Sequence, residues 1–99
     1  MAENQKIIDV EQFARQKKKI PVGPANQYKI KVNRDYFICN SRFVTGNDVL
    51  KIAGKDVSSH HLNADYGNGN VQPVQLNEQI DLVQGVIRFI ATPVQAVNG

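Results

Sequence analysis

The apolar positions from Tyr28 onwards form short alternating runs that are typical of half-buried strands. In YKIKVN, Tyr28, Ile30 and Val32 alternate with lysines, so a period of two places the apolar side chains on one face. The turn-forming residues 33–35 and the apolar run 36–39 follow directly. This pattern predicts a second strand that returns beside the first as a hairpin.

A short helix is predicted after the hairpin. Thr45 is a good N-cap, and Asp48 three residues later can complete a capping box. Residues 49–53 supply an apolar face, and Gly54 stands where a helix C-cap takes the left-handed conformation.

The remaining sequence predicts three more strands. Residues 60–66 and 86–92 alternate, whereas 71–76 is a short run that Pro73 confines to the edge of a sheet. The order strand, strand, helix, strand, short strand, strand predicts an α+β fold. We expect a mixed sheet of about five strands with one main helix packed on one face.

The first 26 residues predict a separate segment. Their apolar positions recur unevenly and allow a short amphipathic helix over about residues 8–18, before two prolines that interrupt regular structure. Such a segment either stays solvated or orders on a partner. The expected organisation is a flexible basic extension over 1–26, a folded domain over 27–92 and a flexible C-terminal tail over 93–99.

Composition agrees with a sheet-rich domain and excludes several classes of protein. The chain has 12 valines and 9 isoleucines against 4 leucines, and β-branched residues favour strands. One cysteine excludes an intramolecular disulfide framework and a multi-cysteine zinc site. The polar start is unlike a secretory signal, and no apolar run reaches the roughly 18 residues of a membrane span. We therefore expect a cytoplasmic protein without a membrane partner.

The net charge of +3 is concentrated near the N-terminus. Residues 1–26 carry +2, and residues 27–99 carry +1. A nucleic-acid-binding domain usually shows a basic stripe across its folded part. Nucleic acid is therefore not the expected partner.

Several motifs occur in a fixed order along the chain: Thr45-Gly46, Val49-Leu50, Ile52-Ala53-Gly54-Lys55, Ile80-Asp81-Leu82, and Gly85 with Arg88-Phe89-Ile90. Together they resemble the bacterial multiubiquitin family, and the predicted element order is that of the ubiquitin β-grasp. The resemblance covers about two thirds of the chain. The chain departs from the family pattern in its single domain and in its N-terminal extension.

The resemblance implies a ubiquitin-like β-grasp fold and a protein modifier of a bacterial ubiquitination-like pathway, not an enzyme. Its partners would be activating and conjugating enzymes, a deconjugating metallopeptidase and target proteins, and some such operons are tied to phage defence. The modifier would hold no cofactor of its own, because the ATP is used by the activating enzyme. It would be monomeric when free and located in the bacterial cytoplasm.

A modifier of this kind works through its C-terminal carboxylate, which makes Gly99 the candidate conjugation residue. A terminal glycine has no Cβ, so the tail can thread a narrow channel and its carbonyl is unhindered. Truncation of the sequence at this point is the alternative explanation. The candidate acceptors for chain formation are the amines of Lys6, Lys17, Lys18 and Lys19.

Alternation in the last predicted strand suggests a partner-binding surface. It places Ile87, Phe89 and Ala91 on one face, and Val86, Arg88 and Ile90 on the other. On this outer face Arg88 and Ile90 would lie beside His61 and Asn63, and an exposed isoleucine between Arg and His resembles the interaction patch of ubiquitin. The alternative is that one exposed isoleucine is ordinary on any surface.

Other chemistry has weaker support in the sequence. His60 and His61 point to opposite faces of a strand and lack a third ligand, and Cys39 is typical of a small packed hydrophobe. We expect no metal site and no catalytic residue. The alternative functions are a non-covalent β-grasp module that binds protein or nucleic acid and, less favoured, a sulfur carrier.

Overall fold

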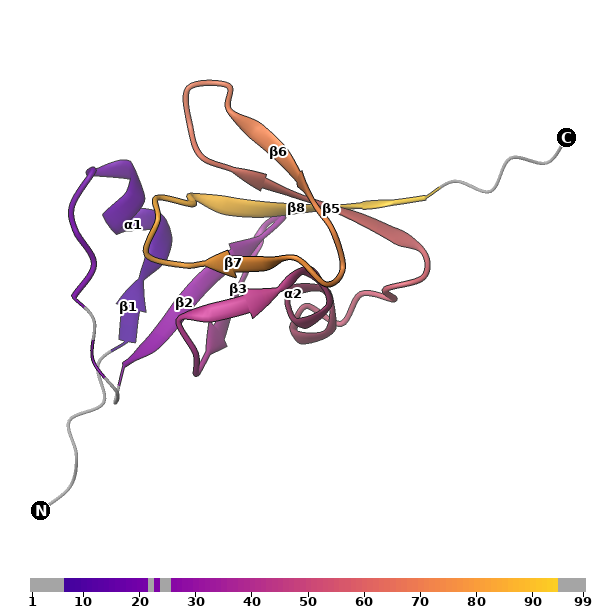
Figure 1. The fold of residues 1–99 in the computed structure, drawn as a ribbon, viewed down its shortest axis with the longest axis horizontal. Helices are drawn as coiled ribbons and strands as arrows, with labels where there is room; N and C mark the ends of the chain where they lie inside the picture. The colour runs from indigo at the N-terminus through magenta and orange to yellow at the C-terminus, as the bar shows by residue number, and fades with distance from the viewer. Residues whose placement is uncertain (1–6, 22, 24–25, 95–99) are drawn as a thin grey trace, which may run out of the picture.

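A six-stranded mixed sheet forms the body of the protein in the computed structural model, which describes residues 7–21, 23 and 26–94 (Figure 1). Its strands are β1 (Ile7–Asp9), β2 (Gln27–Val32), β3 (Asp35–Cys39), β5 (His60–Asp65), β6 (Val71–Val74) and β8 (Arg88–Pro93). The hairpin partner β3 lies on one side of β2. On the other side of β2 lie both β1 and β8, which run parallel to it, and β5 and β6 continue the sheet beyond β8.

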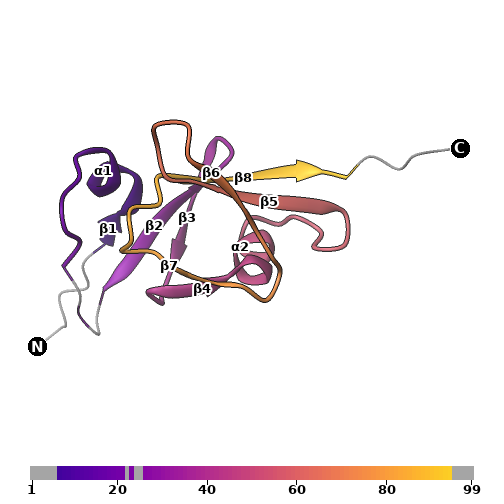
Figure 2. The same ribbon diagram turned by 45° about the horizontal axis from the view of Figure 1, so that its top comes forward.

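One face of this sheet is covered by a helix and a small second sheet (Figure 2). The helix is α2 (Gly46–Ile52), and the second sheet pairs β4 (Phe43–Thr45) with β7 (Gln79–Asp81). Arg42 and Asp81 join the two short strands through Nη2 and Oδ2, 2.8 Å apart. Apolar side chains from all these elements form one core, in which Val49, Leu50 and Phe89 are among the most deeply buried.

The predicted helix caps are confirmed. The Thr45 hydroxyl accepts a hydrogen bond from the Asp48 backbone N–H at 3.1 Å, and the Asp48 carboxylate accepts one from the Thr45 N–H at 3.0 Å. At the other end Gly54 has a φ of +71°, and the Lys55 N–H donates to the Leu50 carbonyl at 2.8 Å. Local sequence signals therefore fix both ends of α2.

The expected α+β class with a mixed sheet and an edge strand at Pro73 is confirmed, but the sheet has six strands. The sixth is β1, which comes from the segment expected to be a separate, solvated extension. It is followed by helix α1 (Val10–Arg15), and Ile8, Val10 and Ile20 are only 4%, 1% and 4% exposed. The expectation of a flexible extension is therefore wrong for residues 7–20, because β1 pairs with β2 and its side chains complete the core.

The last strand also differs from its prediction at both ends. The strand begins at Arg88 and not at residue 86. Val86 was expected on the outer face but is buried, and Ile87, expected on the core face, is half-buried. Gly85, with a φ of +94°, turns the chain just before this point. At the far end β8 reaches Pro93, and the Val94 N–H donates to the Ser59 carbonyl at 2.8 Å, so the expectation of a flexible tail is wrong for residues 93 and 94. The rest of that expected tail, 95–99, lies outside the described residues.

Asn33 joins the hairpin turn to β8. The backbone ladder between β2 and β8 has one register pair, Val32 with Phe89, and the Asn33 N–H donates to the Phe89 carbonyl at 2.9 Å. The Asn33 side chain then bonds both backbone groups of Ala91, donating to its carbonyl at 3.1 Å and accepting from its N–H at 2.9 Å. One side-chain amide thus continues the parallel pairing where the backbone of β2 has already turned away.

Replacing Asn33 by glycine is expected to destabilise the fold by about 1–3 kcal/mol, since it leaves the N–H and carbonyl of the buried Ala91 without these partners. Glycine adopts the φ of +57° found here without strain, so the loss of unfolding free energy measures the contribution of the side-chain hydrogen bonds. Urea unfolding gives the free energy. The matched control is Asn68→Gly, at a φ of +55° in an exposed turn, and equal stability of the two variants would contradict this role for Asn33.

Candidate functional site

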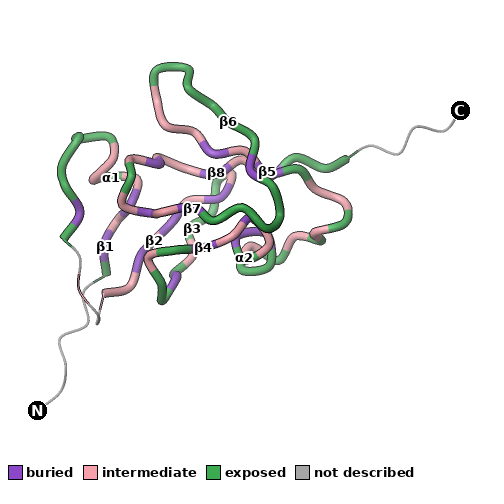
Figure 3. The backbone as a smooth tube through the Cα atoms, in the orientation of Figure 1, coloured by how far each residue is buried: buried purple, intermediate pink, exposed green. Residues whose placement is uncertain are grey.

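The outer face of β5 and β8 brings the four predicted partner-binding residues together. In the antiparallel register Asn63 lies directly opposite Ile90, and His61 lies opposite Thr92. Arg88 is two residues before Ile90 on the same face, opposite Asp65. The alternate residues of both strands are buried beneath them, as the colouring of Figure 3 shows.

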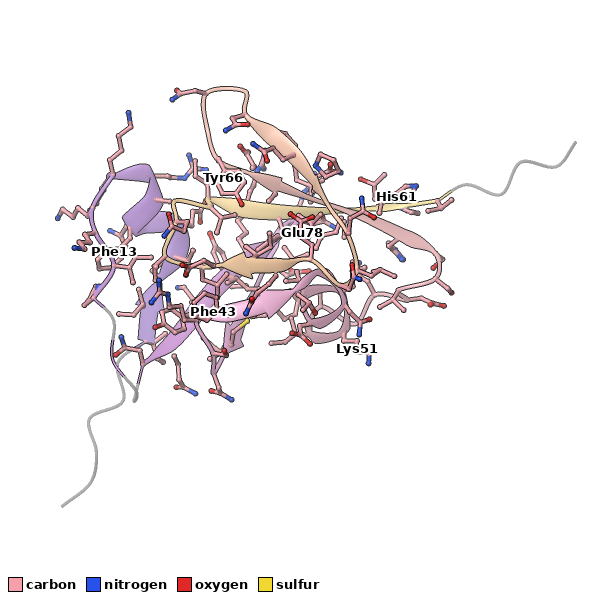
Figure 4. All side chains as sticks on the ribbon, in the orientation of Figure 1. Phe13, Phe43, Lys51, His61, Tyr66 and Glu78 are labelled. Atoms are coloured by element: carbon pink, nitrogen blue, oxygen red, sulfur yellow. The ribbon has the colours of Figure 1, made fainter. Side chains whose placement is uncertain are left out.

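These four residues differ in how far they are available to a partner. His61 is exposed, and Figure 4 shows it on β5 near the end of β8, whereas Asn63, Arg88 and Ile90 are half-buried. The expectation of an exposed isoleucine is therefore wrong. Ile90 lies in a central strand, directly opposite Asn63 of β5, and cross-strand neighbours of this kind reduce the exposure of a side chain.

Arg88 is committed to an ion pair with Asp65. Its Nε lies 3.1 Å from the Asp65 Oδ2, and the Gly67 N–H donates to the other carboxylate oxygen at 2.8 Å. The Gly67 hydrogen bond first, and Arg88 after it, hold the pKa of Asp65 below its usual range. The carboxylate therefore stays charged at neutral pH, and the guanidinium of Arg88 is already paired there.

The N-terminal segment covers the neighbouring part of the same outer face. Glu11, on α1, accepts a hydrogen bond from the Tyr36 hydroxyl at 2.7 Å and lies 3.6 Å from the Lys31 ammonium. Arg15 contacts the same carboxylate at 3.0 Å, and Lys29 lies 3.5 Å from Asp9. Acids of the segment thus neutralise lysines that β2 presents outward.

Sequence reasoning missed this docking, although its signals are present. Asp9 is an N-cap whose carboxylate accepts from the Gln12 N–H at 3.2 Å, and Glu11 and Arg15 are spaced to pair along a helix. Ile8 and Val10 flank that cap and are the side chains that enter the core. The cap marks where the helix begins, but nothing local indicates that the segment pairs with β2.

The remaining sequence candidates are dispersed. Lys17, Lys18 and Lys19 are exposed in the turn after α1, whereas Lys6 and Gly99 lie outside the described residues. The last described residue is Val94, at the end of β8 that points toward the C-terminus in Figure 1.

His60 and Cys39, the other side chains considered for chemistry, are hydrogen-bonded and buried respectively. The His60 Nδ1 lies 3.0 Å from the Asp56 carbonyl oxygen. Burial raises the pKa of the Cys39 thiol to about 11, which keeps it protonated at neutral pH. Within residues 7–21, 23 and 26–94 no group of three or more His, Cys, Asp or Glu side chains is placed to hold a metal ion.

Comparison with known proteins assigns the chain to no family: no family model, no curated protein and no solved structure matches it. Among the described residues, neither helix has the length and apolar character needed to span a membrane.

Replacing Glu11 by glutamine is expected to lower the pKa of Tyr36. The hydrogen bond to the Glu11 carboxylate is the largest cause that raises this pKa above its ordinary value, because ionising the tyrosine would place two negative charges side by side. Absorbance titration of tyrosinate, with Tyr36→Phe to identify the signal, measures the shift. An unchanged Tyr36 titration in the Glu11→Gln variant would show that the N-terminal segment does not dock on this face.

Proposed function

We propose that the chain is a ubiquitin-like protein modifier with a β-grasp fold, conjugated to target proteins through Gly99. The strand order supports the β-grasp part of this proposal. The first hairpin and the last strand meet as the parallel pair β2 and β8, α2 follows the hairpin and packs on one face, and β5 and β6 extend the sheet. That is the arrangement expected from the motifs that resemble the multiubiquitin family.

The observation that carries the proposal is the way the chain leaves the fold. The central strand β8 runs to Pro93, and the hydrogen bond between Val94 and Ser59 anchors the chain just before its final residues. Five residues follow Val94 in the sequence, and a chain of that length spans at most about 17 Å when extended. A partner that holds the domain could therefore receive the terminal carboxylate within that distance of Val94.

The chemistry of such a modifier needs no catalytic group from this chain. The Gly99 carboxylate attacks the α-phosphorus of ATP on the activating enzyme, and pyrophosphate leaves. A cysteine thiolate of that enzyme then takes the acyl group and AMP leaves, before a lysine amine of the target displaces the thiolate. The second and third attacks occur at the glycine carbonyl, which has no Cβ beside it to hinder them.

A hollow beside the free edge of β3 favours a second candidate, a non-covalent adaptor. It has a volume of about 270 Å³ and lies between β3, β4 and α2. Ile38, Phe43 and Ile52 line it with exposed apolar side chains, and Figure 4 labels Phe43. Exposed apolar groups beside an unpaired strand edge are features of surfaces that bind other chains.

Deleting Gly99 distinguishes the two candidates. The full chain, mixed with ATP and the activating enzyme encoded beside it, is expected to support pyrophosphate exchange and to form an adduct lighter by one water than its two components. The deletion variant is expected to lose both activities, because its terminal carboxylate is displaced by one residue and carried by asparagine. Exchange assays and intact-protein mass spectrometry provide the measurements.

The control for this experiment is Gln95→Ala, which alters the tail but keeps its length and its terminal glycine. It should retain exchange and adduct formation. An adduct that forms equally well without Gly99, or that joins the chain through another residue, would contradict the proposal. Unchanged partner binding by the deletion variant, together with no exchange by the full chain, would favour the adaptor.

A further inference from the structure

Three consecutive lysines after α1 are the most concentrated unpaired charge in the described part of the chain. Lys17, Lys18 and Lys19, termed the lysine turn below, are all exposed, and none forms an ion pair within the described residues. The cations of the outer sheet face, and Arg42 just before β4, behave differently. Their acidic partners lie within 4 Å in every case: Lys29 with Asp9, Lys31 with Glu11, Arg42 with Asp81 and Arg88 with Asp65.

The lysine turn borders a hollow of about 590 Å³. Across it lie the turn after β5 and the segment before β8, which contribute the side-chain amides of Asn70 and Gln84. Tyr66, which Figure 4 shows above β8, lines both this hollow and a smaller one, and Lys17 lines both as well. Among the described residues, neither lining contains an aspartate or glutamate.

The backbone at Lys17 provides an independent indication that this lysine has a role. It has a φ of +55°, and the N–H of Lys18 donates to the Phe13 carbonyl at 2.9 Å, as in the glycine-ended helix caps. Glycine takes this conformation without steric strain, whereas lysine does not. The chain therefore holds a strained residue at a point where the side chain borders both hollows, and strain of this kind is concentrated at functional positions.

We propose that the lysine turn and the amides opposite it bind an acidic segment of a partner protein. The ammonium groups would pair with aspartate or glutamate carboxylates. The Asn70 amide, whose oxygen accepts from the Gln72 side chain, would donate a further hydrogen bond, and so would the second Nε2 hydrogen of Gln84, whose Nε2 already donates to the Asp81 Oδ2 at 3.4 Å. The site does not use Gly99, so it goes beyond the proposed conjugation and could operate whether or not the chain is conjugated.

A protein partner fits this site better than nucleic acid because the positively charged surface extends over only three residues. A nucleic acid carries a phosphate at every nucleotide, and its binding surfaces continue as a basic stripe. Here the nearest cation along the chain, Arg15, is paired with Glu11, and the outward lysines of β2 are paired as well. Three unpaired lysines around one hollow match a few carboxylates of a folded or extended acidic segment.

Titration of the full chain with a synthetic peptide of six alternating glutamates and aspartates tests this site. Nuclear magnetic resonance should show shifts at the lysine turn and at Asn70 and Gln84. The triple variant Lys17→Gln, Lys18→Gln, Lys19→Gln should bind roughly tenfold more weakly or worse, since each exposed pair contributes a fraction of the affinity. The matched control changes net charge equally elsewhere, through Arg34→Gln, Lys51→Gln and Lys55→Gln, and should change affinity less than about twofold.

The variant Lys17→Gly separates a binding role from a structural one. It should raise the melting temperature, because the strain at this position is relieved, and lower the affinity for the acidic peptide. Equal loss of affinity in both triple variants would overturn the proposal by showing general charge attraction. Tighter binding of a duplex of 12 base pairs than of the peptide, lost in the lysine-turn triple, would overturn it in favour of nucleic acid. Unchanged peptide affinity in Lys17→Gly would also contradict it.

Discussion

The attachment of the last strand to the first hairpin through Asn33 is the interaction on which the fold depends. The ladder between β2 and β8 has one backbone register pair, and the Asn33 side chain extends it by bonding both backbone groups of Ala91. This attachment places β8 in the middle of the sheet, where β5 pairs with its other side. The sheet can therefore bury one face beneath α2 and the small β4–β7 sheet, and it releases the chain at Val94.

The short contact between β2 and β8 has a second consequence, which explains the role of the N-terminal segment. Since β8 begins only at Arg88, the first half of β2 has an open edge, and β1 pairs along it in parallel. Unpaired backbone groups in such a position would have to remain hydrated beside an apolar core. Ile8 and Val10 enter the core at this point. On the outer face, Glu11 neutralises the charge of Lys31 and accepts a hydrogen bond from the Tyr36 hydroxyl.

The elements that the sequence predicted well are those with local causes. The hairpin follows from alternation and a turn at Asn33, and α2 follows from its capping residues and Gly54. The elements that were missed depend on residues distant in the chain. The β4–β7 pairing joins segments 36 residues apart at Val44 and Ile80, and no alternation in either segment is long enough to indicate a strand. Ile90 was expected to be exposed because a period of two gives the face but not the neighbours that cover it.

The unpaired lysines and the C-terminal end of β8 lie at opposite ends of the molecule. The lysine turn lies beside α1, at the opposite end of the long axis from the point where β8 releases the C-terminal residues, and Figures 1 and 2 agree on this arrangement. Lys29, Lys31 and Arg88, which lie between these ends, are paired with acids of β1, α1 and β5. An acidic segment bound at the lysine turn would therefore leave the C-terminal exit uncovered. A partner could hold the domain at one end while the carboxylate of Gly99 reacts at the other, and the two proposed activities would not compete for the same surface.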